Sequence, residues 1–116
     1  MKPMIMVRDI NGYVTYGIPF SENRFSGLLA QDTEQTLTVP SSPFPDYKKL
    51  LAIFIFEPGS LVWVALNDDA EAPSGSVSAT TSEGNPAARE VQGGDVLHFI
   101  TNDTSAEFGV TFYAIQ

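Results

Sequence analysis

The sequence predicts an all-β protein: a β-sandwich or jelly roll of about seven or eight short antiparallel strands with an N-terminal arm. No stretch has apolar residues at the helical spacing i, i+3, i+4 and i+7 over three turns. Segments rich in aromatic and β-branched residues recur instead, separated by turn-forming residues that include eight prolines. The 116 residues fit one domain, with residues 1–9 expected as the arm and 10–116 as the sandwich.

The first strands of the sandwich are expected within residues 10–39. Residues 13–18 are rich in aromatic and β-branched side chains, which favours a strand. Residues 36–39 alternate, so Leu37 and Val39 should share one face while the threonines occupy the other. The proline-rich stretch that follows should be an extended connection to the next strand.

A β-hairpin is predicted over residues 50–66. Residues 50–56 and 60–66 are nearly continuous apolar runs, and the proline and glycine of residues 57–60 suit a turn between them. Both runs are apolar on both faces, whereas a sheet of a sandwich normally has one wet face. A second covering layer is therefore expected, either the chain's own arm or, as we favour, a neighbouring subunit.

This reasoning predicts an interface that combines one face of the hairpin with the N-terminal arm. Apolar side chains of one parity in the hairpin would be buried between subunits, and the arm would contact a neighbour. The residues predicted to form this interface are Phe54, Phe56, Val62, Val64, Met4, Met6 and Arg8.

The rest of the chain is expected to contain a second hairpin over residues 95–115. Residues 102–105 are turn formers, and apolar runs flank them on both sides. The polar segment 75–80 should be an edge strand. Residues 86–90 could form one helical turn, with Asn85 as its cap.

Charge and composition exclude several classes of protein. The net charge is −8, and residues 51–116 carry nine acidic side chains but one basic one, Arg89. Nucleic-acid binding needs clustered lysine and arginine, so no nucleic-acid partner is expected. The longest apolar run, residues 50–56, is too short for a membrane helix. There is no cysteine and no recognisable signal peptide, so a protein made and used without export is expected.

Few residues suggest chemistry. His98 is the single histidine and lies in an apolar run, which is typical of a packed side chain rather than a catalytic one. The acidic cluster of Asp68, Asp69 and Glu71 is a weak candidate for Ca²⁺, although it lacks the spacing of an EF-hand. No nucleophile elbow, P-loop or dinucleotide-binding motif is present. We therefore expect no enzyme activity and no cofactor.

Aromatic residues offer a carbohydrate-binding alternative. Trp63 is the only tryptophan, but it lies within the driest run, which favours a core or interface position. Tyr13, Tyr16 and Phe20 are the freer candidates for a sugar platform.

Two stretches resemble small virion proteins of tailed bacteriophages. The first contains Gln35-Thr36-Leu37-Thr38-Val39-Pro40, a dry strand ending in Glu57-Pro58-Gly59, and Val62-Trp63-Val64-Ala65. The second runs from Asn85-Pro86-Ala87-Ala88-Arg89-Glu90 through Gly93-Gly94-Asp95 to His98-Phe99-Ile100, with Phe112-Tyr113 near the end. The resemblance covers roughly residues 12–116. It lies in the composition of these segments and in their order along the chain, and it includes no catalytic motif.

The resemblance implies a virion structural protein, with capsid decoration (cement) proteins as the closest class. Such a protein would be made in the host cytoplasm and located on the capsid surface. Its partners would be the major capsid protein or other virion proteins, and a homotrimer is favoured. Two alternatives stay open: a carbohydrate- or receptor-binding module of a virion, and a small jelly-roll enzyme in which His98 acts.

Overall fold

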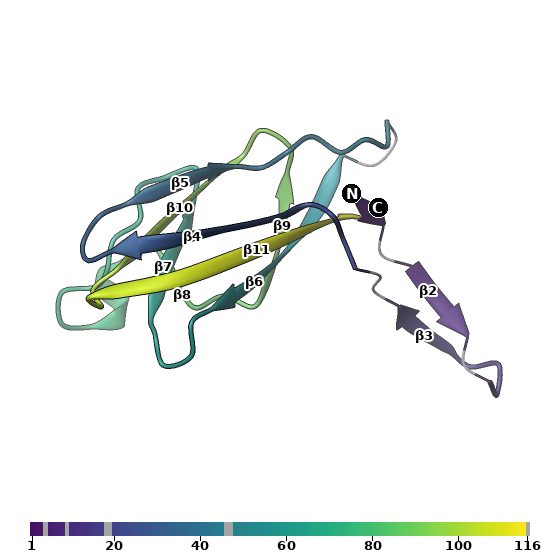
Figure 1. Ribbon diagram of the computed structural model, residues 1–116, viewed down its shortest axis with the longest axis horizontal. Helices are drawn as coiled ribbons and strands as arrows, with labels where there is room; N and C mark the ends of the chain where they lie inside the picture. The colour runs from purple at the N-terminus through teal and green to yellow at the C-terminus, as the bar shows by residue number, and fades with distance from the viewer. Residues whose placement is uncertain (4, 9, 18–19, 46–47, 116) are drawn as a thin grey trace.

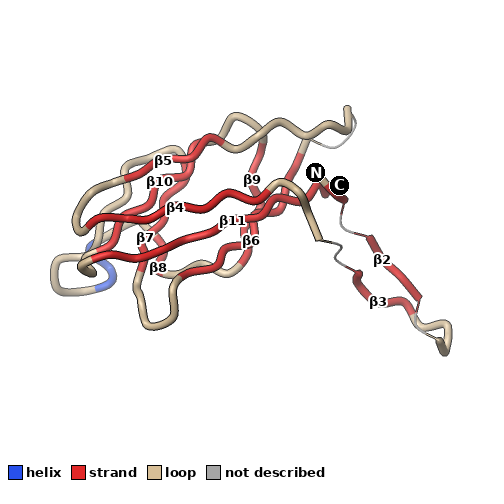
Figure 2. Tube along the Cα trace, in the orientation of Figure 1, coloured by secondary structure: helices blue, strands red, loops and turns tan. Residues whose placement is uncertain are grey.

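The computed structural model describes residues 1–3, 5–8, 10–17, 20–45 and 48–115 (Figure 1). In this part of the chain the protein is all-β, with two larger sheets packed against each other and a two-stranded hairpin projecting from one end (Figures 1 and 2). Within the same ranges, no helix has the length and apolar character that a membrane span requires. The prediction of an all-β sandwich is confirmed.

The first sheet is built around the long C-terminal strand. Its strand order is β4, β11, β6 and β9, and all these neighbours are antiparallel. A short strand, β1, pairs in parallel with the end of β11, beyond the part that β4 covers. The bounds are β1 (Lys2–Pro3), β4 (Arg24–Ala30), β6 (Lys49–Phe56), β9 (Ala88–Gln92) and β11 (Ser105–Ile115).

The second sheet has the order β5, β10, β7 and β8, again with antiparallel neighbours. The alternation predicted for residues 36–39 is confirmed, because Leu37 and Val39 pack into the core while Thr36 and Thr38 are exposed. The bounds are β5 (Gln35–Thr38), β7 (Val62–Leu66), β8 (Glu83–Gly84) and β10 (Val96–Thr101).

The strand order is that of a jelly roll. When the strands from β4 to β11 are numbered one to eight, the two sheets read 1-8-3-6 and 2-7-4-5. Every connection crosses from one sheet to the other except the one from β7 to β8. This pattern of two interlocked Greek keys is the double-sheet jelly roll.

Both predicted hairpins are wrong, although their strands are present. β6 and β7 lie in different sheets, and so do β10 and β11. The turn at residues 57–60 does form, with the Ser60 N–H donating to the Glu57 carbonyl at 3.0 Å, but it carries the chain across the sandwich. A tight turn between two apolar strands serves a hairpin and a sandwich corner equally well, so local sequence cannot separate them.

Two further local predictions are wrong. Within 75–80 lies a 3-10 turn, η1 (Val77–Ala79), and the edge strand is β8 instead. The predicted helical turn at residues 86–90 is mostly strand β9, which pairs with β6. Asn85 adopts a left-handed φ of 43°, and its Oδ1 accepts a hydrogen bond from the Val62 N–H at 2.8 Å. It therefore anchors a corner to β7 rather than capping a helix.

The core lies between the two sheets and explains one of the dry faces. Phe54, Val62 and Val64 point into it and are buried within the single chain, so they are not available to a neighbouring subunit. Phe56 is partly buried and packs against the same core. The predicted interface is therefore wrong for Phe54, Val62 and Val64, because the opposite sheet supplies the layer that was assigned to a subunit.

The outward face of β7 is also buried within the chain. Trp63 points away from the core but is buried, and Gly84 of β8 lies so close that an added Cβ would sit 3.2 Å from the indole ring. On β6 the same outward face is uncovered, because Ile55 is 72% exposed. The outward face predicted to be dry on both strands is therefore buried on β7 and exposed at Ile55 on β6.

Candidate functional site

A β-hairpin projects from the end of the sandwich where both termini lie (Figures 1 and 2). It consists of β2 (Ile5–Arg8) and β3 (Val14–Gly17), which pair antiparallel, and we call it the projecting hairpin. The residues expected as an arm, 1–9, are divided: β1 belongs to the main sheet, and β2 is half of this hairpin.

The turn of the projecting hairpin displays apolar surface. Ile10 is fully exposed, and Tyr13 is 73% exposed. The guanidinium Nη1 of Arg8 donates a hydrogen bond to the Gly12 carbonyl at 2.9 Å, which ties the turn to the end of β2. Gly12 has a φ of 83°, a conformation that favours glycine. The turn is therefore held by local contacts while its apolar side chain faces solvent.

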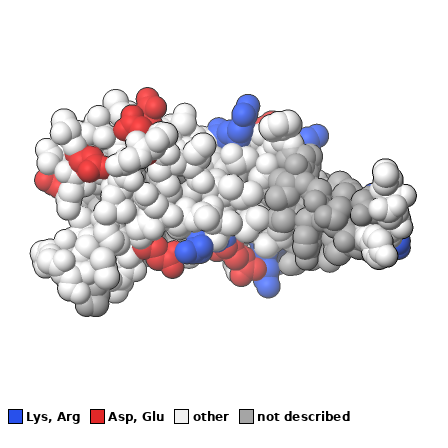
Figure 3. Space-filling model, turned by 90° about the horizontal axis from the view of Figure 1, so that it is seen from below, with Lys and Arg blue, Asp and Glu red and all other residues white. Residues whose placement is uncertain are grey.

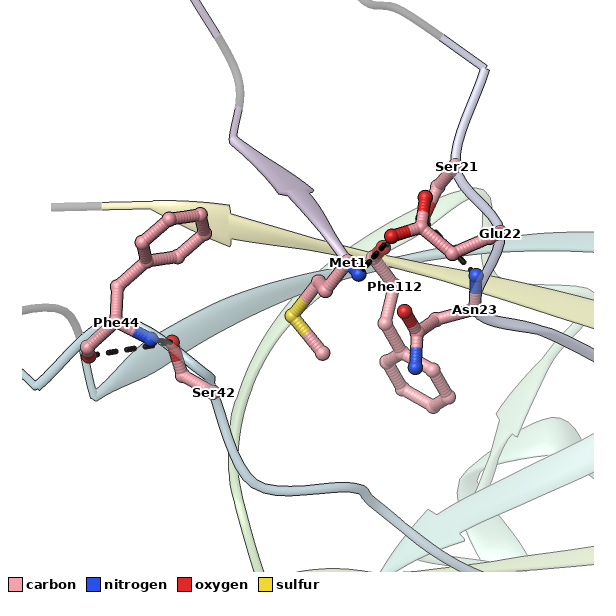
Figure 4. A network of polar contacts seen from close by, with 7 residues as sticks. All are labelled: Met1, Ser21, Glu22, Asn23, Ser42, Phe44 and Phe112. Carbon is pink, nitrogen blue, oxygen red and sulfur yellow. Dashed lines mark hydrogen bonds and ion pairs between the residues drawn. The ribbon is translucent and has the colours of Figure 1, made fainter.

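The base of the projecting hairpin is fastened to β11 (Figure 4). The Ser21 hydroxyl donates to the Phe112 carbonyl at 2.8 Å, and the Phe112 N–H donates to the Asn23 carbonyl at 3.0 Å. On the other side, the Met1 ammonium forms an ion pair with Glu22. Its hydrogen bond to the carboxylate lowers the pKa of Glu22. The segment after the hairpin is therefore bound to β11, the segment before it pairs with β11 through β1, and the ion pair joins these two segments to each other.

An apolar groove lies on the outer face of the first sheet. It has a volume of about 460 Å³ and runs over Gly27 of β4 and Gly109 of β11, with Leu28 and Ile55 exposed beside it. A Cβ at Gly109 would lie 2.9 Å from Cγ2 of Ile55, so a larger residue would displace that side chain. Gly109 therefore shapes this surface.

A second cavity, of about 370 Å³, lies at the edge of the sandwich formed by β8 of one sheet and β9 of the other. Its floor includes the core residues Val64 and Val91. Its rim carries Arg89, whose Nε donates to the Glu83 carboxylate at 2.6 Å. An apolar floor with a polar rim is the usual composition of a small-ligand pocket.

The third feature is a cluster on the outer face of the second sheet. The Nδ1 atom of His98 lies 2.8 Å from Oε1 of Glu34, and Oε2 of Glu34 accepts a hydrogen bond from the Ala70 N–H at 2.9 Å. The bond to His98 and the one from Ala70 lower the pKa of Glu34, although partial burial opposes them. A carboxylate oxygen of Asp69 completes the group, with all three ligand atoms within 4.8 Å of one another.

The predicted Ca²⁺ candidates are therefore divided. Asp69 joins Glu34 and His98, which the sequence reasoning did not connect with it, whereas Asp68 and Glu71 are not in the group. Oδ1 of Asp68 accepts a hydrogen bond from the Asp69 N–H at 2.8 Å, which is an ordinary turn contact. No local signal could have found this group, because its members are far apart in the chain.

The remaining predicted site residues fall as follows. Met4 lies outside the described residues, Met6 lies in β2, and Arg8 is exposed at the end of that strand. Tyr16 lies in β3, and Phe20 follows the hairpin as an exposed side chain. Of the aromatic candidates for a sugar platform, Tyr13 and Phe20 are thus accessible.

Comparisons with known proteins leave the chain without an assigned relative, since no family model, no curated protein and no solved structure matches it.

Proposed function

We propose that this protein is a non-catalytic virion structural protein, a capsid decoration protein that binds the shell of the major capsid protein through its projecting hairpin. The observation that carries the proposal is the fully exposed Ile10 at the turn of a projecting hairpin whose flanking segments are bound to the sandwich. An exposed apolar side chain at the end of a projecting hairpin is suited to insertion into a partner.

The energetics of such docking favour a repeating surface. Burying apolar area contributes about 25 cal/mol per Å², and association costs offset much of it. One small hairpin turn therefore gives a weak contact. Several copies held on a lattice, or joined in one oligomer, bind more tightly through effective concentration. A capsid presents such a lattice.

The jelly-roll architecture is compatible with this role, since viral capsid proteins share it, but so do lectins and enzymes. The sequence resemblance to small virion proteins of tailed phages adds support for the virion reading. The proposal therefore depends on the hairpin rather than on the fold.

Replacing Ile10 with aspartate is expected to weaken binding to purified capsids that lack the protein by at least about tenfold, because it places a charge in an apolar contact. Binding is measured by co-sedimentation over a range of protein concentrations. The matched control is Val77→Asp, at an exposed apolar side chain in η1 that lies on the sandwich. If Ile10→Asp and wild type occupy the capsids equally, the projecting hairpin is not the contact with the capsid.

We further propose that the protein is a homotrimer whose subunits meet at the apolar groove beside Leu28 and Ile55. Ile55→Lys should convert the trimer to monomers, because it puts a charge into a surface that association would dry. Light scattering gives the mass of both proteins, and circular dichroism checks that the variant stays folded. A wild-type monomer at capsid-binding concentrations would contradict this arrangement.

The edge cavity favours one alternative function, a carbohydrate- or receptor-binding module of a virion. Its apolar floor and the ion-paired Arg89 at its rim could take part of a small ligand. A glycan array distinguishes the two functions, since a decoration protein should bind capsids and no glycan.

A further inference from the structure

We infer that Glu34, Asp69 and His98 form a binding site for a first-row divalent transition-metal ion, of which Zn²⁺ is the type. The site is independent of the proposed capsid contact, because it lies on the outer face of the β5–β10–β7–β8 sheet rather than on the projecting hairpin.

The first argument is convergence. Glu34 precedes β5, Asp69 follows β7, and His98 lies within β10. Three ligand atoms from separate segments meet within 4.8 Å. Ligand atoms about 2.1 Å from one tetrahedral zinc ion are about 3.4 Å apart, so small side-chain movements suffice to close the site. This arrangement differs from a row of acidic residues in a single loop, whose side chains are neighbours only because they are adjacent in the sequence.

The second argument is the kind of ligand. An imidazole nitrogen with two carboxylate oxygens suits Zn²⁺ and its first-row neighbours, whereas Ca²⁺ and Mg²⁺ prefer oxygen ligands alone. The site therefore differs in chemistry as well as in residues from a calcium site built on Asp68, Asp69 and Glu71.

The third argument is that two of the three ligands are already positioned. Side-chain exposure is 16% for His98 and 29% for Glu34, and the two side chains are hydrogen-bonded to each other. Glu34 is also held by the Ala70 N–H. Asp69 is exposed, which leaves an approach for the ion from solvent. On binding, the metal would take the place of the direct contact between the imidazole and the carboxylate.

The expected consequence is structural. Ala70 and Asp69 lie in the long connection between β7 and β8, whose described helical content is the single turn η1. A metal ion bound by Asp69 and the two strand-side ligands would fasten this connection to the sheet. Because the ion binds the folded state, it should raise the unfolding temperature, and the rise should continue with the logarithm of the free-ion concentration above the Kd.

The test is a titration of EDTA-treated protein with Zn²⁺. Calorimetry measures the binding, and NMR monitors the imidazole signals during the titration. The chain has one histidine, so its ring signals need no assignment. We expect one ion per chain, a shift of the ring nitrogen signal at the same stoichiometry, and much weaker binding of Ca²⁺.

Two loop variants with the same charge change provide the control. Asp69→Asn removes a ligand and should weaken Zn²⁺ binding by about tenfold or more, since even second-shell losses cost 10–100-fold. Asp68→Asn keeps the oxygen that accepts the Asp69 N–H and should stay within about threefold of wild type. Equal weakening in both variants, or an unshifted imidazole at saturation, would show only diffuse attraction to acidic residues and overturn the site.

Discussion

Replacing Phe99 with alanine is expected to lower the free energy of unfolding by about 3–5 kcal/mol. Phe99 is fully buried in β10, and its ring stacks on Phe108 of β11 with a centroid distance of 4.2 Å. It also meets Phe54 of β6 edge-on at 6.3 Å. Since β10 lies in one sheet and the other two strands in the opposite sheet, the substitution removes the aromatic contact that joins the two layers.

Urea unfolding followed by circular dichroism measures this loss. Phe20→Ala is the matched control, because Phe20 is almost fully exposed and its loss should change stability by less than about 0.5 kcal/mol. If Phe99→Ala does not fold, Phe99→Leu should still fold and lose less. A loss below about 1 kcal/mol in Phe99→Ala would mean that this ring does not join the sheets as described.

Replacing Thr101 with valine is expected to cost about 2–4 kcal/mol, although the two side chains have nearly the same shape. The buried Thr101 hydroxyl donates to the Leu61 carbonyl at 2.8 Å and accepts from the Asp103 N–H at 3.1 Å. Valine leaves two partly buried backbone groups without this partner, and each such loss costs about 1–2 kcal/mol. The Asp103 carboxylate also accepts from the Leu61 N–H at 2.9 Å, so the hydroxyl belongs to a small network.

The loss of stability in Thr101→Val should measure how much this hydrogen-bond network stabilises the fold. The network joins the turn after β6 to the turn after β10, two of the corners where the chain changes sheets. Urea unfolding should give a lower midpoint with an unchanged slope, and amide exchange should quicken at Asp103. Thr38→Val, at an exposed position in β5, is the control and should be nearly neutral. A neutral Thr101→Val would contradict the role of the hydroxyl.

The fold shows where the charged side chains lie on the surface and which of them form ion pairs. The face in Figure 3 shows acidic side chains at the end away from the projecting hairpin and also along the middle, where they lie beside basic ones; basic side chains lie along the middle and nearer the hairpin. The ion pairs Lys49–Glu90 and Arg89–Glu83 join acidic side chains of the second half of the chain to basic ones on β6 and β9. Exposed pairs of this kind contribute little to stability.

The sequence alone determined the secondary structure in its main parts. Strand residues were recognisable because alternation is a local property: Leu37 and Val39 face the core, and Phe108, Val110 and Phe112 do the same on β11. The class of fold followed from these strands and from the frequency of turns. Strands β4, β8 and β9 were missed: β4 lacks clear alternation, β8 has only two residues, and β9 has a single β-branched residue, Val91.

Tertiary structure alone decided which strands pair and which residues meet. A turn of four residues fixes that the chain reverses, but the choice between a hairpin and a crossing depends on how both sheets share one core. The same limit applies to function: Glu34, Asp69 and His98 have no sequence relation to one another, and only the jelly-roll crossings bring them within 4.8 Å. The chemistry of each side chain can be read from the sequence, whereas the distances between side chains depend on the whole fold.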